Sequence, residues 1–219
     1  MILFNKNLEL LRTSQPCLAR RVEQQPEQTS VRVAMSKDGY PVPQIGSISL
    51  HSNYYPLKEA SQAVNGFEIL DGQHPVVYGL GFGYHVLEIL NKNPENKILV
   101  IEPLMSLFQA FMESVDLKPF IFNTTFIIAE PPPKILVYHE PKNWKVYKHP
   151  ASMKISNIYY KRMDRAREVS EYLAKSKLKI LVVNPYYGGS LPTAKYCIQA
   201  LNNIGHQAKS VDCEKFVEG

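Results

Sequence analysis

Three glycines at alternate positions are the strongest chemical signal in the sequence. Gly79, Gly81 and Gly83 directly follow the apolar run 75–78 and precede a stretch with helical spacing of apolar residues. Glycines there let the backbone turn sharply and approach a ligand, while the following helix offers N–H donors to an anionic group. Glu102 ends the next apolar run, where a carboxylate can accept hydrogen bonds from both hydroxyls of a ribose. The pattern predicts a nucleotide site built by these four residues.

The spacing of the glycines bears on the identity of the cofactor. Tyr84 stands where the dinucleotide pattern G-x-G-x-x-G places its last glycine, so the sequence reads G-x-G-x-G. This departure favours an S-adenosylmethionine-type turn over an NAD-type turn. The alternative is a Rossmann-like turn without a ligand, because Tyr84 and His85 crowd the mouth of the predicted site.

A dense group of polar and aromatic residues, 51–56, precedes the glycine turn. His51 and Tyr54 are candidate contacts for a nucleotide or a sugar, since they offer hydrogen-bonding atoms and stacking faces. The alternative is a capping turn, in which Ser52 or Asn53 caps the helix that follows.

A second glycine-rich segment occurs near the end of the sequence. Gly188, Gly189 and Ser190 follow the apolar run 179–183 and precede a helical pattern over 192–204. The backbone amides of such a loop can bind phosphate, and its glycines allow close approach to a sugar. The alternative is a tight strand-to-helix connection that needs glycine for its dihedral angles.

Other kinds of site are not indicated. His139, Glu140 and His149 show no spacing typical of a metal site, so no metal is expected. The sequence contains no G-x-S-x-G nucleophile elbow, Walker loop or kinase signature, and no catalytic residue is assigned.

The elements that must position these residues alternate between strand and helix. Residues 46–153 are therefore expected to form a Rossmann-like, methyltransferase-like α/β domain with a parallel sheet. Its expected strands are the apolar runs 75–78, 97–101 and 126–129. After them, the segments 135–139 and 145–148 are expected to form an extended hairpin that closes the sheet.

The remaining segments flank this domain. Residues 1–45 are expected to form a small α+β preface, with a helix at 7–12 followed by a polar stretch. Residues 154–177 are expected to form a basic helix that connects the Rossmann-like domain to the last unit. Residues 178–219 predict one βαβ unit, which cannot bury its own faces and is interpreted as the first part of a truncated, larger domain.

Composition excludes several classes of protein. The chain has 219 residues, of which 45% are hydrophobic and 21% charged, typical of a globular protein rather than a disordered or collagen-like one. No apolar run approaches the roughly 20 residues that span a bilayer, and the start shows no secretory signal. Three widely spaced cysteines fit neither a disulfide framework nor a zinc site, so a cytoplasmic location is expected.

The formal net charge of +5 arises in one segment. Residues 154–179 contain eight basic and three acidic residues, an excess that equals the whole net charge. A basic helix can bind nucleic acid or an anionic membrane surface, or it can be a solvated connector. No nucleic-acid-binding motif accompanies the charge, so no nucleic-acid partner is expected.

Four segments, taken together, suggest a family. They are HSNYYPLKEA at 51–60, YGLGFGYH at 78–85, IEP at 101–103 and HPAS at 149–152. Over roughly residues 45–165 the sequence resembles the amino-terminal Rossmann-like region of the bacterial motility accessory factor (Maf) family, which is associated with glycosylation of flagellin. That family's central domain, with its own glycine-rich phosphate-binding segment, does not follow here. The resemblance therefore implies no transferase activity for this region.

The last unit carries a second resemblance. ILVVNPYYGGS at 180–190 and LNNIGH at 201–206 look like the opening of a GT-B glycosyltransferase, as in the CgeB-like glycosyltransferases. In such enzymes the Gly-Gly loop lies at the cleft between the two halves. The resemblance implies that Gly188 and Gly189 contribute to the transferase cleft of a complete protein, whose donor-binding half is absent here.

These observations lead to one hypothesis with two alternatives. The hypothesis is an amino-terminal, Rossmann-like accessory part of a bacterial glycosyltransferase for protein or surface glycosylation, not catalytic alone. Its implied partners are the missing carboxyl-terminal transferase region and an acceptor protein, and its implied ligand is a nucleotide sugar or S-adenosylmethionine. One alternative is an S-adenosylmethionine-dependent methyltransferase, favoured by the glycine turn and Glu102. The other is a non-catalytic module that docks a partner through the basic helix.

Overall fold

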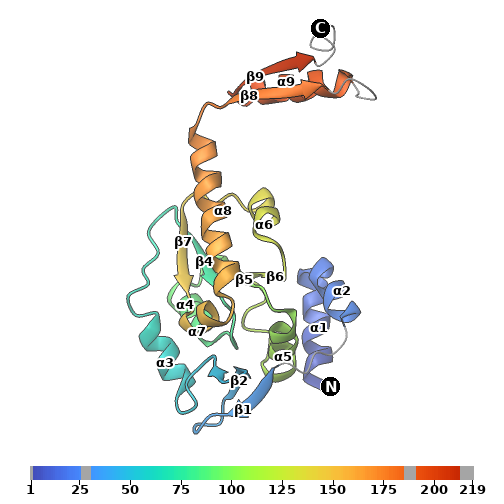
Figure 1. Cartoon of the computed structure of the whole chain (residues 1–219). Coiled ribbons are helices and arrows are strands. Elements are labelled where there is room, and N and C mark those ends of the chain that lie inside the picture. The colour runs from blue at the N-terminus through green and yellow to red at the C-terminus, as the bar shows by residue number, and fades with distance from the viewer. Residues whose placement is uncertain (1, 26–30, 185–190, 213–219) are drawn as a thin grey trace. The chain divides into compact units, whose positions relative to one another are not determined.

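The computed structural model describes residues 2–25, 31–184 and 191–212 of the chain (Figure 1). The chain divides into two compact units, Met1–Ala166 and Arg167–Gly219, and each is described by itself.

A four-stranded parallel sheet forms the centre of the larger unit. Its strands are β4 (His74–Tyr78), β5 (Ile98–Glu102), β6 (Thr124–Ile128) and β7 (Trp144–Lys148). Their order in the sheet is β6-β5-β4-β7, and every neighbouring pair is parallel. This confirms the predicted Rossmann-like sheet. The chain runs from β4 outward to β6 and then crosses back to β7, so the strand order reverses between β4 and β7. In open α/β sheets, ligands bind outside the carboxyl ends of the strands at such a switch point.

The predicted hairpin at the end of the sheet is wrong. Residues 132–138 form a helix, α6 (Pro132–Tyr138), and β7 pairs in parallel with β4 rather than with the preceding segment. Prolines in the first turn favour the helix because their missing N–H is not needed there. The apolar run in this segment is too short for its periodicity to separate helix from strand.

Helices cover both faces of the sheet because side chains along each strand alternate between them. Val77 and Val100 face the main core, which α4 (Tyr84–Lys92) and α5 (Met105–Ser114) help to form. Val76 and Tyr78 face a second cluster, formed with α6 and α8 (Asn157–Lys175). The Tyr78 ring stacks on the Tyr160 ring with centroids 5.4 Å apart. Figure 1 shows α6 and α8 on the near side of this sheet.

The preface belongs to the same compact unit. Residues 1–45 contribute α1 (Ile2–Ser14), α2 (Pro16–Gln24) and two strands of a three-stranded antiparallel sheet. The third strand and the helix α3 (Pro56–Ala63) follow after residue 45. The three strands are β1 (Arg32–Met35), β2 (Pro41–Ile45) and β3 (Ile48–Ser49). The polar stretch expected after the first helix is instead α2, which buries Leu18, Ala19 and Val22. The helix has nine residues, so its apolar positions span too few turns for the helical period to be recognised in the sequence.

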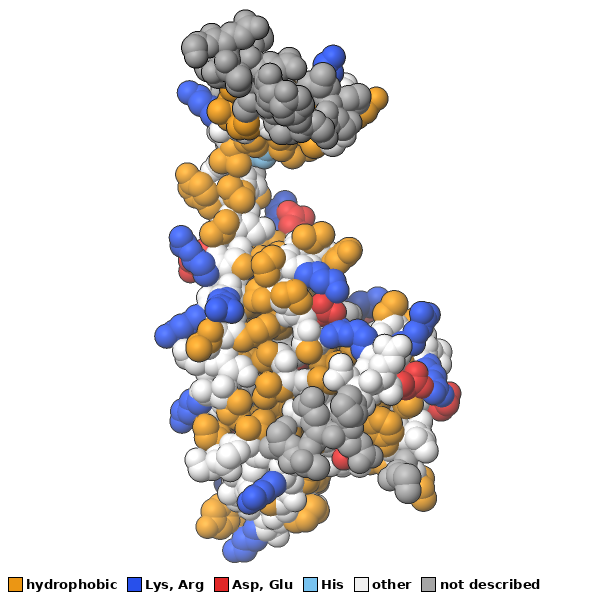
Figure 2. Space-filling model, turned by 45° about the vertical axis from the view of Figure 1, so that its right-hand side comes forward, with side chains coloured by type: hydrophobic (Ala, Val, Ile, Leu, Met, Phe, Trp, Pro, Cys, Tyr) orange, Lys and Arg blue, Asp and Glu red, His pale blue; other side chains and the backbone are white. Residues whose placement is uncertain are grey.

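The segment expected as a basic helix, 154–177, is mostly α8, and its first two residues belong to a separate short helix, α7 (Pro150–Ile155). Its charges are partly paired, since Lys148 Nζ lies 2.6 Å from Asp164 and Arg167 lies 3.7 Å from Glu171. Lysine and arginine side chains on the face drawn in Figure 2 are scattered among hydrophobic ones rather than gathered in one patch. No helix in the described part of the chain is long and apolar enough to cross a membrane.

The smaller unit contains the predicted βαβ arrangement. Strands β8 (Lys179–Asn184) and β9 (Gln207–Asp212) are parallel, and α9 (Leu191–Asn203) connects them. Gly205 follows α9 with a φ of 93°, as expected for a residue that ends a helix in the left-handed conformation. Gly188, Gly189 and Ser190, the predicted sugar and phosphate loop, lie outside the described residues.

Candidate functional site

The glycine turn has the backbone geometry that its sequence predicts. Gly79, Gly81 and Gly83 all have positive φ values, of 94°, 51° and 76°. The turn begins where the amide of Gly79 donates to Ile101 O at 2.9 Å and closes where the amide of Gly83 donates to Leu80 O at 2.8 Å. Gly83 is also the residue before the first turn of α4.

Side chains of the protein accept hydrogen bonds from two of the backbone amides of this turn. The amide of Leu80 donates to Glu102 Oε2 at 3.0 Å, and the amide of Phe82 donates to His51 Nε2 at 2.8 Å. The other oxygen of Glu102 accepts from the amide of Leu104 at 2.9 Å. The structure therefore brings Glu102 and His51 to the turn, where their polar atoms bind the protein's own backbone.

The space around the glycines is also filled. A Cβ atom at Gly79 would collide with Ser152, one at Gly81 with His51, and one at Gly83 would lie 2.8 Å from Phe120. A larger residue at any of these positions would clash with a side chain that packs directly on the turn. Glycine is therefore needed for space as well as for its positive φ. From the sequence, the glycines are expected to let a ligand approach the backbone closely. The sequence pattern does not show whether the approaching group is a ligand or a side chain of the protein.

Glu102 lies deep inside the protein. Its side chain is 1% exposed, and burial raises the pKa of Glu102 to about 7, although the two backbone N–H groups favour the charged form. Ligand binding by the three glycines and Glu102 stays a prediction, in which a ribose would compete with the amides of Leu80 and Leu104.

Tyr54 and its neighbours form a local turn on the surface. The Tyr54 side chain is 63% exposed, and Ser52 Oγ accepts from the amides of Tyr54 and Tyr55 at 3.2 Å each. Tyr55, not Ser52 or Asn53, is the residue that precedes α3, and its side chain makes no capping hydrogen bond. The amide of Ser52 donates to Glu59 Oε2 at 2.7 Å, which orients that carboxylate.

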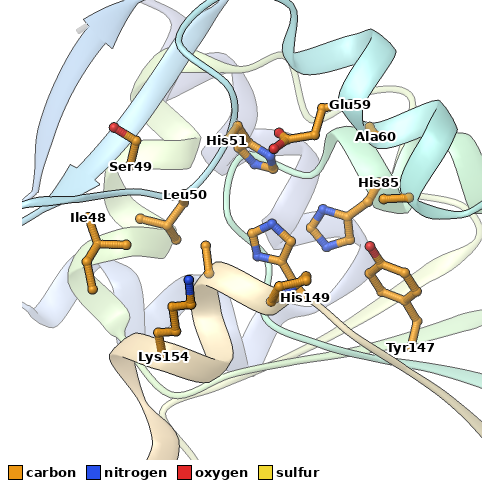
Figure 3. A pocket seen from close by; sticks show the side chains of 13 residues that line it. Ile48, Ser49, Leu50, His51, Glu59, Ala60, His85, Tyr147, His149 and Lys154 are labelled. Atoms are coloured by element: carbon orange, nitrogen blue, oxygen red, sulfur yellow. The ribbon is translucent and has the colours of Figure 1, made fainter.

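Three buried histidines meet beside the glycine turn. His51 follows β3, His85 lies in the first turn of α4, and His149 follows β7. The rings of His85 and His149 are stacked, with centroids 4.3 Å apart and an angle of 6° between planes, and His51 lies 5.0 Å from His149 (Figure 3). Linear spacing could not reveal this group, because each histidine comes from a different segment.

Hydrogen bonds fix the orientation of these rings. His85 Nε2 lies 2.9 Å from Gly79 O, and His149 Nδ1 lies 2.8 Å from Ser152 Oγ. Burial lowers the pKa of His85 to about 4, and it lowers the pKa values of His51 and His149 well below the usual histidine range. All three imidazoles are therefore neutral near pH 7.

A cavity of about 290 Å³ adjoins the histidines. It lies outside the carboxyl ends of β4 and β7, which is the switch point of the sheet. Its polar and aromatic lining residues are Ser49, His51, Glu59, His85, Tyr147, His149 and Lys154. Figure 3 shows His85 and Tyr147 on one side of the cavity, with Glu59 above them and Lys154 at the opposite end. Of the predicted site residues in the described part of the chain, His51 alone lines it.

Comparison with known proteins gives one structural likeness. No protein-family model matches the chain, and no curated protein sequence matches it. The structure is similar to that of the MAf glycosyltransferase from Magnetospirillum magneticum AMB-1, with a TM-score of 0.54 and 14% sequence identity. The match covers 96% of this chain and 46% of that one, so the chain spans about half the length of the solved structure. At this identity the likeness shows that the two share a fold.

Proposed function

We propose that this chain is the amino-terminal, Rossmann-like accessory part of a bacterial glycosyltransferase that acts in protein or surface glycosylation. The observation that carries the proposal is the structural likeness to a MAf glycosyltransferase, which covers 96% of this chain but 46% of the other. In this proposal the partner of the chain is a carboxyl-terminal transferase region, and the two act together on an acceptor protein in the cytoplasm.

The geometry of the glycine turn supports an accessory rather than a catalytic role. The amides of Leu80 and Phe82 are bound to Glu102 and His51, so they are not available to a transferring group.

An assay of turnover tests this proposal. The chain alone should release no nucleotide from UDP-, GDP- or CMP-sugars and should transfer no sugar to host glycoproteins. Measurable turnover by the chain alone would contradict the accessory role.

A binding measurement separates the proposal from the methyltransferase alternative. Calorimetry with S-adenosylmethionine and S-adenosylhomocysteine should show no binding, because the Glu102 side chain is buried and both of its oxygens already accept backbone N–H groups. Micromolar binding that is lost in Glu102→Ala but kept in the surface variant Glu95→Ala would favour a methyltransferase instead.

A further inference from the structure

We infer that the cavity lined by His85, Glu59 and Lys154 binds a neutral, hydroxyl-rich sugar ring, and that His85 Nδ1 accepts a hydrogen bond from one of its hydroxyls. The choice of a sugar rests on the proposed function. The position and chemistry of the site rest on the structure alone.

The first argument is an acceptor without a partner. His85 Nε2 lies 2.9 Å from Gly79 O, and because a carbonyl oxygen only accepts, Nε2 carries the proton. In the neutral ring Nδ1 is then an acceptor, and this buried atom has no hydrogen-bond partner. A buried acceptor left unpaired costs roughly 1–3 kcal/mol. A ligand that donates a hydrogen bond to Nδ1 would recover that free energy.

The charges around the cavity argue against an anionic ligand. The three imidazoles are neutral near pH 7, so they contribute no positive charge. Among the described lining residues, the charged groups are one carboxylate, Glu59, and one ammonium, Lys154. A phosphate would meet the Glu59 carboxylate and a single cation, whereas proteins usually bind phosphate with several donors of positive charge or a free helix terminus.

The orientation of the rings argues against a metal ion. Potential ligand nitrogens of His51, His85 and His149 lie within 4.8 Å of one another. The lone pair of His51 Nε2, however, accepts the amide of Phe82. The near-parallel planes of His85 and His149 also prevent their in-plane lone pairs from converging on one ion.

The remaining features of the cavity suit a sugar ring. The Glu59 carboxylate, held by the amide of Ser52, accepts hydrogen bonds from hydroxyls, and the Lys154 ammonium donates to them. The C–H groups of a sugar can pack against apolar residues of the lining, which include Ile48, Ala63 and Ala151. A volume of about 290 Å³ is at the small end for ligand sites, which fits one sugar ring better than a whole nucleotide sugar.

The test is a binding measurement with free sugars. Saturation-transfer NMR and calorimetry would use the whole chain with methyl glycosides of glucose, galactose, mannose and N-acetylglucosamine. At least one should bind and shift the imidazole ¹⁵N signal of His85 Nδ1. His85→Gln should weaken that binding at least tenfold, because the Gln amide can still donate to Gly79 O but offers no acceptor at the Nδ1 position.

Two further variants keep the test decisive. His74→Gln changes a histidine that does not line the cavity and should leave the affinity unchanged. Glu59→Gln changes an exposed side chain, so it should fold even if His85→Gln does not, and it should weaken binding severalfold. Thermal unfolding of each variant checks that the fold is intact.

Three outcomes would overturn the inference. They are binding of no methyl glycoside by the unaltered chain, binding unaffected by both His85→Gln and Glu59→Gln, and binding of Zn²⁺ or inorganic phosphate alone with loss in His85→Gln. None of these results contradicts the proposed function, which fails instead if loss of the gene leaves the host's glycoproteins unchanged.

Discussion

At the scale of single residues, two side chains of the protein accept hydrogen bonds from backbone amides of the glycine turn. In a nucleotide-binding turn such amides donate to the ligand. His51 Nε2 accepts the amide of Phe82, and Glu102 accepts that of Leu80. Both interactions are buried, and both place an acceptor where a phosphate or ribose oxygen would be expected from the sequence pattern. These two hydrogen bonds stabilise the turn.

Replacing Gly81 tests how closely His51 packs on the turn. Gly81→Ala should lower the free energy of unfolding by about 2–4 kcal/mol, because its φ is positive and its Cβ would collide with His51. Gly46 has a similar φ of +58° with nothing near its Cβ, so Gly46→Ala should lower the free energy by only about 1 kcal/mol. Urea unfolding of both variants measures the difference, and equal losses would contradict the contact.

The buried histidines predict a loss of stability in acid. Their folded pKa values lie below that of an unfolded histidine, so the unfolded chain binds more protons as the pH falls below about 6.5. The folded pKa of Glu102 is raised, so between about pH 4.5 and 7 the folded chain binds the extra proton and this group adds stability as the pH falls. It is one such group against three histidines that remove stability. The urea midpoint should therefore fall between pH 7 and pH 5. A midpoint that stays constant or rises would show that the histidines are not buried as neutral groups.

At the scale of elements, strong patterns were predictable and weak ones were not. The strands β4, β5 and β6 follow from continuous apolar runs, and the glycine turn after β4 follows from its spacing. Helix α2 is not predicted because it is short, and the apolar run of α6 is too short to distinguish a helix from a strand. The histidine group could not be predicted, since it forms only when three distant segments meet at the switch point.

A buried asparagine on α1 holds this helix against the end of α5. Asn7 on α1 donates to Met112 O and Val115 O at 2.8 and 2.7 Å and accepts from the amide of Leu117 at 2.9 Å. Asn7→Ala should lower the free energy of unfolding by about 3 kcal/mol, because three backbone groups at the end of α5 lose their partner.

The exposed residue Asn5 on the same helix provides the matched control. Asn5→Ala should change the free energy of unfolding by less than about 0.5 kcal/mol. Calorimetry or urea unfolding compares the two variants, and a loss below 1 kcal/mol in Asn7→Ala would contradict the role assigned to these hydrogen bonds.

At the scale of the whole molecule, the two units differ in how completely they bury their sheets. The larger unit covers both faces of its parallel sheet with helices. In the smaller unit, Leu181 and Val183 on β8 are 61% and 59% exposed. Parallel sheets are normally covered on both faces, whereas these two side chains of β8 are largely open to solvent.

This difference predicts unequal protection of the two sheets. In the whole chain, backbone amides of β8 and β9 should exchange with solvent deuterium at least tenfold faster than those of β4 and β5, because fewer buried contacts hold them. Hydrogen exchange followed by mass spectrometry measures this. Equal protection of the two pairs of strands would show that the smaller unit is stable by itself.

The most direct test of the proposed function is genetic. Deleting the gene from its host and weighing the host's glycoproteins by mass spectrometry asks whether the chain is needed for glycosylation. We expect the glycan masses to disappear and to return when the unaltered gene is restored. Glycoproteins that keep their full mass in the deletion strain would contradict a role for this chain in glycosylation.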